Sequence, residues 1–233
     1  MSNNITLAQV ARIAPLTDSI LQLILAPETY IDYEAGQYLQ VLLANEEFSY
    51  SIANAPLGSR TYELHIRHSA DNPYNQALLA HVKQHGTLAI TLPFGECHLT
   101  KLLPQKPILF IAGGTGFAPI KAMIEQLLAG GKPRPFELLW GARSQSDLYM
   151  DELVTHWQTH VQQFEYFSII SDASKETLAS KALARHKGVL NDWQIVISGP
   201  FDMVYNTRDL LVAAGALPEN LFSDAFSFEA TRP

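Results

Sequence analysis

A buried strand that breaks into glycines and then into a helix is the feature that most constrains this fold. Residues 108–112 form a continuous apolar run, as a strand covered on both faces of a parallel sheet requires. Gly113, Gly114, Thr115 and Gly116 follow at once, and a helical stripe of apolar residues then covers 117–128, with Pro119 tolerated in its first turn. The unit fits either a tight strand-to-helix turn or a site for a phosphate-bearing ligand beyond the end of a strand. It lacks the Gly-Lys-Ser/Thr of a P-loop and the G-x-G-x-x-G spacing of the Rossmann fingerprint.

The rest of the second half repeats this alternation of an apolar strand with an amphipathic helix. Further apolar runs cover 136–140, 166–170 and 194–197. Helical stripes cover 147–161 and the segment from 202 onward. The alternation predicts a doubly wound, mostly parallel α/β sheet. In such a sheet ligands bind beyond the carboxyl ends of strands, so the sequence favours a ligand site at the glycine turn over a merely structural turn.

The first half has a different sequence pattern, in which short β-rich runs are separated by turn residues. The predicted strands cover 19–25, 38–43, 50–53, 62–67 and 87–92. One short helix, over 74–82, lies between the last two of them. This spacing predicts an antiparallel barrel or sandwich. Prolines at 104 and 107 punctuate the chain, and we therefore expect two domains, 1–103 and 104–233.

Composition narrows the class of protein. The formal net charge is −7, and the 16 Lys and Arg form no basic run, so a nucleic-acid partner is not expected. No leader peptide and no apolar stretch that could span a bilayer stand out, so we expect a cytoplasmic protein with no membrane partner. One cysteine, Cys97, can form neither an intrachain disulfide nor an iron–sulfur cluster, so a redox cofactor would be organic.

Several motifs accompany the glycine turn in a fixed order. They are Tyr50-Ser51-Ile52, the glycines with Pro119, Trp140-Gly141-Ala142-Arg143, and Gly199-Pro200 with Met203. Together they resemble the ferredoxin–NADP reductase superfamily, and Gly36-Gln37-Tyr38-Leu39 and residues 221–228 also match its compact bacterial NAD(P)H:flavin oxidoreductases. The resemblance implies a flavin-binding barrel followed by a nicotinamide nucleotide domain, with the flavin ring between them.

The resemblance also implies roles for individual residues. Ser51 would be catalytic, with its hydroxyl near the flavin N5 that accepts a hydride from NADH or NADPH. The flavin (FMN, FAD or riboflavin) would contact Tyr50, Ser51, Ile52, His65, Ile66, Arg67 and Phe226. The nucleotide would contact Gly113, Gly114, Thr115, Gly116, Pro119, Gly141, Arg143, Gly199, Pro200 and Met203. No metal site is expected, and the His81/His85 and His156/His160 pairs are interpreted as polar helix surface.

The chain departs from the family where flavin phosphate is held. Relatives with tightly bound flavin carry an arginine two residues before the tyrosine, whereas this chain has Phe48 there. Residues 71–75 replace the usual glycine and serine that bind phosphate, which leaves Arg67 as a candidate clamp. Because an arginine–phosphate pair is a strong contact, its loss predicts weakly held or diffusible flavin.

Several alternatives stay open. The leading hypothesis is a flavin reductase that releases reduced flavin. A second is a reductase component that keeps its flavin and serves an acceptor protein such as an oxygenase or a deoxysugar dehydratase, against which the lack of a fused iron–sulfur domain counts. A third is a silent regulatory module of the same fold. An aromatic ring of the tail either lies near the flavin or faces a core from a last strand, and the candidates are Phe222, Phe226 and Phe228. Cys97 is interpreted as a buried small apolar residue. The preference for NADH or NADPH stays open.

Overall fold

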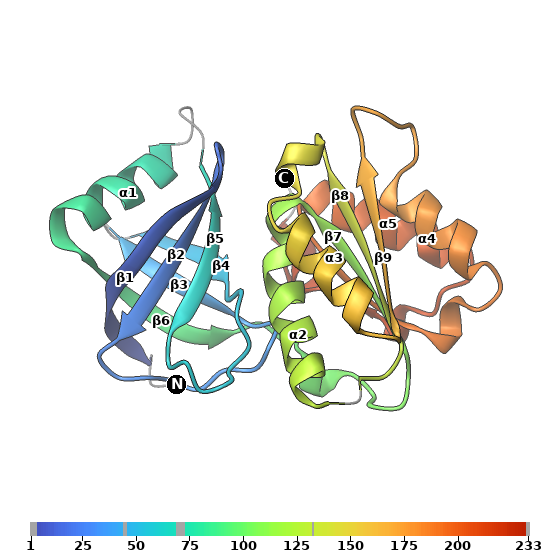
Figure 1. The fold of residues 1–233 in the computed structure, drawn as a ribbon, viewed down its shortest axis with the longest axis horizontal. Coiled ribbons are helices and arrows are strands. Elements are labelled where there is room, and N and C mark those ends of the chain that lie inside the picture. Colours follow the sequence, from blue (N-terminus) through green and yellow to red (C-terminus); the bar gives the residue numbers. More distant parts are fainter. Residues whose placement is uncertain (1–3, 44–45, 69–72, 132, 232–233) are drawn as a thin grey trace.

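Two sheets lie side by side in a computed structural model that describes residues 4–43, 46–68, 73–131 and 133–231 (Figure 1). The first sheet is antiparallel and comes from the first half of the chain. The second is parallel and comes from the second half, as the two sequence rhythms predict. The predicted division at 103/104 falls between the last strand of the first sheet and the first strand of the second, and we propose to keep it there.

The antiparallel sheet has six strands in the order β4-β3-β6-β1-β2-β5. Their bounds are β1 Ile5–Thr17, β2 Ile20–Pro27, β3 Tyr38–Leu43, β4 Glu46–Ser51, β5 Tyr62–Arg67 and β6 Thr87–Phe94. The two outermost strands, β4 and β5, also contact each other, so the sheet curls into a barrel. Helix α1 (Pro73–His85) adds Leu78 and Val82 to the barrel core.

The parallel sheet has five strands in the order β11-β10-β7-β8-β9. Its elements are β7 Ile108–Gly113, α2 Phe117–Ala129, β8 Phe136–Ala142, α3 Asp151–His160, β9 Phe164–Ile170, α4 Leu178–His186, β10 Gln194–Ser198, α5 Phe201–Ala213 and β11 Leu221–Phe222. Helices α2 and α3 cover one face, and α4 and α5 cover the other (Figure 1).

Strand β7 is buried on both faces, which explains its unbroken apolar sequence. Ile108, Phe110 and Ala112 join the core beneath α2 and α3. Leu109 and Ile111 point the other way, into the core shared with α4 and α5.

The strand order reverses at β7, since β8 and β9 extend to one side of it and β10 and β11 to the other. The carboxyl ends of β7 and β10 therefore meet where ligands of open α/β sheets bind. Gly113 ends β7, and Gly199 follows β10 directly. The fold thus brings two of the predicted motifs to one place.

Most differences from the predicted elements occur where local pattern is weak. Strand β4 covers Glu46–Ser51 rather than 50–53, and its early start was not predicted because Glu46 and Glu47 are exposed and carry no apolar alternation. The longest strand, β1, and helix α4 were not among the predicted segments. The reading of Phe222, Phe226 and Phe228 as one last strand is wrong, because β11 stops at Phe222 and a 3-10 helix, η6 (Asp224–Thr231), follows.

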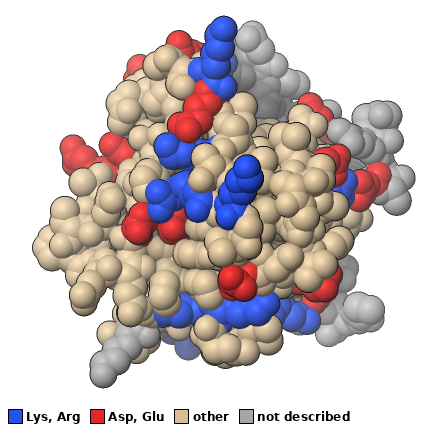
Figure 2. Space-filling model, turned by 90° about the vertical axis from the view of Figure 1, so that its right-hand side faces the viewer, with Lys and Arg blue, Asp and Glu red and all other residues tan. Residues whose placement is uncertain are grey.

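Charge is mixed on the face of the α/β domain seen in Figure 2, where Lys and Arg alternate with Asp and Glu. Within the α/β domain, Arg185 pairs with Glu137 at 2.8 Å and with Glu165 at 2.6 Å. This face presents no surface of a single sign. No helix among the described segments is long and apolar enough to cross a lipid bilayer.

Candidate active site

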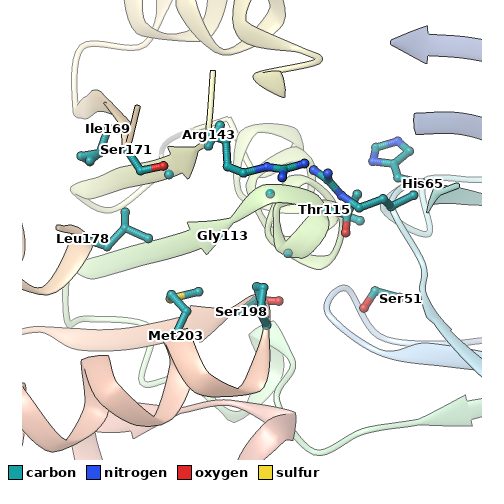
Figure 3. Close-up of a pocket in the computed structure, with 18 of the residues that line it drawn as sticks. Ser51, His65, Gly113, Thr115, Arg143, Ile169, Ser171, Leu178, Ser198 and Met203 are labelled. Atoms are coloured by element: carbon teal, nitrogen blue, oxygen red, sulfur yellow. The ribbon is translucent and has the colours of Figure 1, made fainter. Parts of the chain in front are cut away.

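A cavity of about 850 Å³ opens between the two sheets at the carboxyl ends of β7, β8 and β10 (Figure 3). Predicted residues from both domains line it. From the barrel these are Tyr50, Ser51, His65 and Arg67, and from the α/β domain they are Gly113, Gly114, Thr115, Gly116, Gly141, Arg143, Gly199, Pro200 and Met203. Its volume suits a nucleotide-sized ligand.

A second cavity of about 480 Å³ adjoins the first. Ser49, Ser51, Ser198 and Gly199 line both, so the two cavities meet at the end of β4. Pro119, predicted as a nucleotide contact, lines this smaller cavity instead. Ser51 is therefore the predicted barrel residue that stands at the junction.

The glycine turn is sterically required at Gly116. A Cβ there would lie 2.3 Å from the carbonyl oxygen of Ser198, which real contacts do not allow. Gly114 adopts a left-handed φ of +54° that favours glycine. The indole Nε1–H of Trp140 donates to the Gly114 carbonyl at 3.0 Å. Main chain from β7 and β10 thus approaches closely and leaves the peptides of the turn facing the cavity.

Tyr50 is held against α1 while its neighbour Ser51 faces the cavities. The Tyr50 hydroxyl donates to Oδ1 of Asn75 at 3.3 Å. Burial raises the pKa of Tyr50 to about 12, so the phenol stays neutral at physiological pH. Asn75 also donates through Nδ2 to the carbonyl oxygen of Arg67. Asp71 and Asn72 of the predicted phosphate element lie outside the described residues.

Strand β5 presents a polar stripe to the α/β domain, because alternate residues of a strand share one face. Tyr62, Leu64 and Ile66 point into the barrel core. Glu63 and His65 point the other way and bind residues of the α/β domain, whereas Arg67 lines the cavity.

Lys121 of α2 is the centre of the contacts made by Glu63. Its buried ammonium donates to Glu63 Oε2 at 3.1 Å and to the Ala53 carbonyl at 2.9 Å, and it pairs with Glu125 at 2.8 Å. Burial raises the pKa of Glu63, but the hydrogen bond from His65 and the charge of Lys121 outweigh it and lower that pKa to about 2. Glu63 is therefore ionised, and it ties the barrel to α2.

His65 extends this network to Tyr149, which precedes α3. Its Nε2 lies 2.8 Å from Glu63 Oε1, and its Nδ1 lies 2.9 Å from the Tyr149 hydroxyl. Burial lowers the pKa of His65, so the ring is neutral near pH 7. A proton on Nε2 satisfies both contacts, because Nε2–H donates to the carboxylate and Nδ1 accepts from the phenol. The buried contacts thus fix one tautomer at the cavity wall.

Three predicted flavin contacts line neither cavity. Ile52 and Ile66 are buried in the barrel core. Phe226 packs on the core beneath α5, with the Arg208 guanidinium 5.3 Å from its ring centre. Phe228 is the aromatic residue of η6 that lines the smaller cavity. Roles for Ile52, Ile66 and Phe226 stay predictions.

The far end of the larger cavity contains residues that the sequence analysis missed. Ser171, Glu176, Thr177 and Leu178 line it in the connection from β9 to α4. Thr177 caps α4, because its side chain accepts from the Ser180 N–H while Ser180 binds back to the Thr177 N–H. That capping pair is the signal that could have revealed this helix and, with it, the end of the cavity.

The contacts of Cys97 and Asp224 are those of structural residues rather than of reactive groups. Cys97 is buried, and burial raises the pKa of its thiol, so no reactive thiolate forms. Asp224 of η6 accepts from the N–H groups of Glu96 and Cys97, both at 2.9 Å, and so joins the tail to the barrel. Over the described segments, no group of three or more His, Cys, Asp or Glu could hold a metal ion.

The comparisons with known proteins match this architecture. A family model described as "Oxidoreductase NAD-binding domain" matches residues 110–209. The structure of an Amycolatopsis cytochrome P450 reductase has a TM-score of 0.85 at 21% identity, over 95% of this chain and 69% of that one. A ferredoxin NADP⁺ reductase from Neisseria gonorrhoeae with bound FAD and NADP has a TM-score of 0.75 at 16% identity, over 92% and 93% of the two chains. The chain has the two-domain fold of these reductases, with an NAD-binding oxidoreductase domain in its second half.

The proteins similar to this chain in sequence include two kinds of reductase. Reductase component 1 of terephthalate 1,2-dioxygenase from Comamonas sp is 34% identical over 91% of this chain, and a CDP-6-deoxy-L-threo-D-glycero-4-hexulose-3-dehydrase reductase from Yersinia pestis is 32% identical over 89%. This chain spans 65% and 64% of their lengths. The NAD(P)H-flavin reductase of Vibrio harveyi is 28% identical, over 94% of this chain and 98% of that protein.

Proposed function

We propose that this chain is an NAD(P)H:flavin oxidoreductase that acts on a weakly held or diffusible flavin. The observation that carries the proposal is Ser51, which lines both cavities at their junction. A nucleotide in the larger cavity and a flavin ring reaching the smaller one would meet beside its hydroxyl. The NAD-binding domain matched at 110–209 and the flavin reductase relative support this assignment.

The residues that line the two cavities fit both a nicotinamide nucleotide and a flavin. The glycine turn lines the larger cavity beyond the end of β7, where its main chain could bind a diphosphate, and Gly116 lets that turn pack against Ser198 of β10. A bound flavin supplies the chemistry by accepting a hydride at N5 from the reduced nicotinamide. Ser51 would donate a hydrogen bond at that atom, and Tyr50, held by Asn75, would support the ring. The protein contributes mainly position.

Weak flavin binding is the part of the proposal that rests on Phe48. A phenyl group at this position of β4 offers no charged donor to a phosphate, whereas the arginine of tightly binding relatives does. The ring system alone would then provide most of the affinity. We expect riboflavin, FMN and FAD to bind with dissociation constants within about tenfold of one another.

Oxidation of NADH and of NADPH with and without added flavin tests the proposal. Purified, desalted protein should oxidise nucleotide only when riboflavin, FMN or FAD is supplied. Protein that remains yellow after desalting with stoichiometric FAD would contradict the diffusible-flavin proposal. Comparing the two nucleotides in the same assay also determines the preferred hydride donor.

A second candidate is a reductase component that retains flavin and reduces an acceptor protein. The printed names of the Comamonas and Yersinia relatives favour it, since both are reductases of a larger enzyme system. Activity without added flavin, together with reduction of a protein acceptor, would support this candidate. Inactivity with every flavin and both nucleotides would instead support the silent regulatory module.

A further inference from the structure

His65 is a barrel side chain whose polar contacts lead toward the glycine turn of the other domain. Its imidazole is fully buried, and both ring nitrogens are hydrogen-bonded. Nε2 lies 2.8 Å from the Glu63 carboxylate, which the buried Lys121 ammonium holds in place. Nδ1 is left to accept from the Tyr149 hydroxyl, at 2.9 Å. The position of Tyr149 therefore depends on a residue of β5.

Tyr149 in turn packs against Trp140 of β8. The two rings meet edge to face, with centres 5.2 Å apart and planes at 89°. Phe117, the first residue of α2, stacks on the same indole, with ring centres 4.0 Å apart and planes at 18°. The Trp140 side chain is fully buried. Two aromatic rings thus fix the orientation of the indole, and the hydroxyl of one of them, Tyr149, is held by His65.

The indole of Trp140 determines which way the glycine turn faces. Its Nε1–H donates to the Gly114 carbonyl oxygen at 3.0 Å. Because the peptide that follows Gly114 is trans and planar, the N–H of Thr115 points away from the oxygen that Trp140 holds. Gly114 has the conformational freedom of a glycine, so this peptide needs an external contact to fix it. Both residues line the larger cavity, and the bond therefore fixes the direction of an N–H donor there.

We infer that His65 is a positioning residue for the glycine turn and acts on it through Tyr149 and Trp140. This inference rests on the proposed function, in which the turn binds the diphosphate of the nucleotide. Loss of the hydrogen bond between His65 and Tyr149 would loosen the Tyr149 ring, then the indole, and then the Gly114 peptide. Nucleotide affinity would fall, because binding would also have to order the turn. A residue of the barrel thus influences how tightly the α/β domain binds its nucleotide.

Calorimetric titration with ADP-ribose tests the inference without redox chemistry, because ADP-ribose carries the diphosphate but no nicotinamide. Tyr149→Phe removes only the hydroxyl and keeps the ring beside Trp140. It should weaken ADP-ribose affinity by about 3- to 10-fold, the range for one neutral hydrogen bond. Tyr149 and Trp140 line neither cavity, so this loss cannot come from a missing contact with the ligand. Unchanged affinity in Tyr149→Phe would overturn the inference.

Tyr166→Phe is the matched control for a merely structural effect. The Tyr166 hydroxyl donates to Asp151 Oδ1 at 2.6 Å within the same domain, and Tyr166 also lines neither cavity. Each variant loses one hydrogen bond and should show a lower Tm, but Tyr166→Phe should bind ADP-ribose as wild type does. Equal losses of affinity in the two variants would indicate a general effect of stability and would count against the inference.

A double variant tests whether the effect runs through Trp140. Trp140→Phe removes the indole N–H and should weaken ADP-ribose binding at least as much as Tyr149→Phe does. Adding Tyr149→Phe to Trp140→Phe should then cause little further loss, because the bond to the Gly114 carbonyl is already absent. Fully additive losses would refute a shared path.

Conservative rescue tests the role of His65 itself. An asparagine offers an amide oxygen near the position of Nδ1, which can accept from the Tyr149 hydroxyl, whereas a leucine offers no acceptor. His65→Asn should therefore retain more ADP-ribose affinity than His65→Leu. If the two variants lost equal affinity, the hydrogen bond to Tyr149 would not be the contact that matters.

Kinetics keep this inference distinct from the proposed function. With added flavin, Tyr149→Phe should raise KM for NADH and leave kcat unchanged, since the turn binds a part of the nucleotide remote from the reacting ring. Protein that binds ADP-ribose in a Tyr149-dependent manner but reduces no flavin would support the inference and refute the flavin reductase proposal. Protein that reduces flavin while Tyr149→Phe binds ADP-ribose as tightly as wild type would do the reverse.

Discussion

At the scale of single residues, Ser51 carries the prediction closest to the proposed chemistry. Ser51→Ala removes one hydroxyl at the junction of the cavities, and we expect kcat for flavin reduction to fall by about 10- to 100-fold. Flavin affinity should change little, because ring contacts remain. Stopped-flow reduction at saturating NADH measures the rate. Ser59→Ala, in an exposed turn of the barrel, is the control, and an unchanged rate in Ser51→Ala would remove the proposed role.

Gly116 carries a second residue-scale prediction, which is steric. Gly116→Ala would place a Cβ 2.3 Å from the Ser198 carbonyl oxygen and 2.6 Å from the Gly199 Cα, so the turn and the end of β10 must separate. We expect loss of measurable ADP-ribose binding and a lower Tm. Gly130→Ala is the matched control, since Gly130 has a helical φ of −69° and its nearest such contact is 3.3 Å. Normal nucleotide binding by Gly116→Ala would contradict the close packing described here.

At the scale of elements, the contact between β5 and α2 depends on Lys121. Lys121→Met would leave the buried Glu63 carboxylate without its ion pair, and breaking a buried pair by removing one partner costs about 3–5 kcal/mol. Urea unfolding should therefore show a large loss of stability. The double variant Lys121→Met with Glu63→Gln should recover part of that loss, because no unpaired charge remains.

An exposed ion pair supplies the control for that prediction. Lys101 lies 3.0 Å from Glu96, with side chains 52% and 87% exposed. Lys101→Met should change the free energy of unfolding by less than about 1 kcal/mol, as surface pairs generally do. If Lys121→Met and Lys101→Met lowered the free energy of unfolding by similar amounts, burial of the ion pair between β5 and α2 would not increase its contribution to stability.

At the scale of the whole molecule, stability should fall as pH decreases. The pKa of Glu63 and that of Glu137 are lowered to about 2 from an ordinary value of 4.5. Stabilisation from such groups is complete above the unfolded pKa and is lost as pH falls from about 4.5 toward 2. The lowered pKa of His65 acts in the same direction from pH 6.5 downward, because the unfolded imidazole takes up a proton before the buried ring does.

Urea midpoints at pH 7, 5 and 3 measure this dependence. We expect a modest decrease from pH 7 to 5 and a steeper one from pH 5 to 3. Glu63→Gln and Glu137→Gln should each lower stability at pH 7 and flatten the steep region, since neither variant has that carboxylate to protonate. A midpoint that stays constant from pH 7 to 3 would contradict the ionised, paired state of both groups.

Local sequence patterns were sufficient to predict several strands, the glycine turn and the helix that follows it. The unbroken apolar run of β7, followed by glycines and an amphipathic stripe, predicts a parallel strand, its turn and its helix, and α2 begins at the predicted residue. The bounds of β3 and β5 also agree with the predicted ones. Such features depend on neighbours a few positions away, so periodicity and turn chemistry in the sequence are sufficient to predict them.

The site was less predictable, because its members come from distant segments. Lys121 meets Glu63 across 58 positions of sequence, and His65 meets Tyr149 across 84. The period of β5 predicts that Glu63, His65 and Arg67 share a face, but only the packing of β5 on α2 and the glycine turn decides which partners they find. The same holds for the tail, where the turn from β11 into η6 brings Phe228 to a cavity and leaves Phe226 half-buried against the core beneath α5. Sequence alone determined the two sheets and the glycine turn, whereas tertiary structure decided which charged side chains pair. The physical reason is that the periodicity of a strand or helix determines which side chains share a face, but not which other element packs against that face.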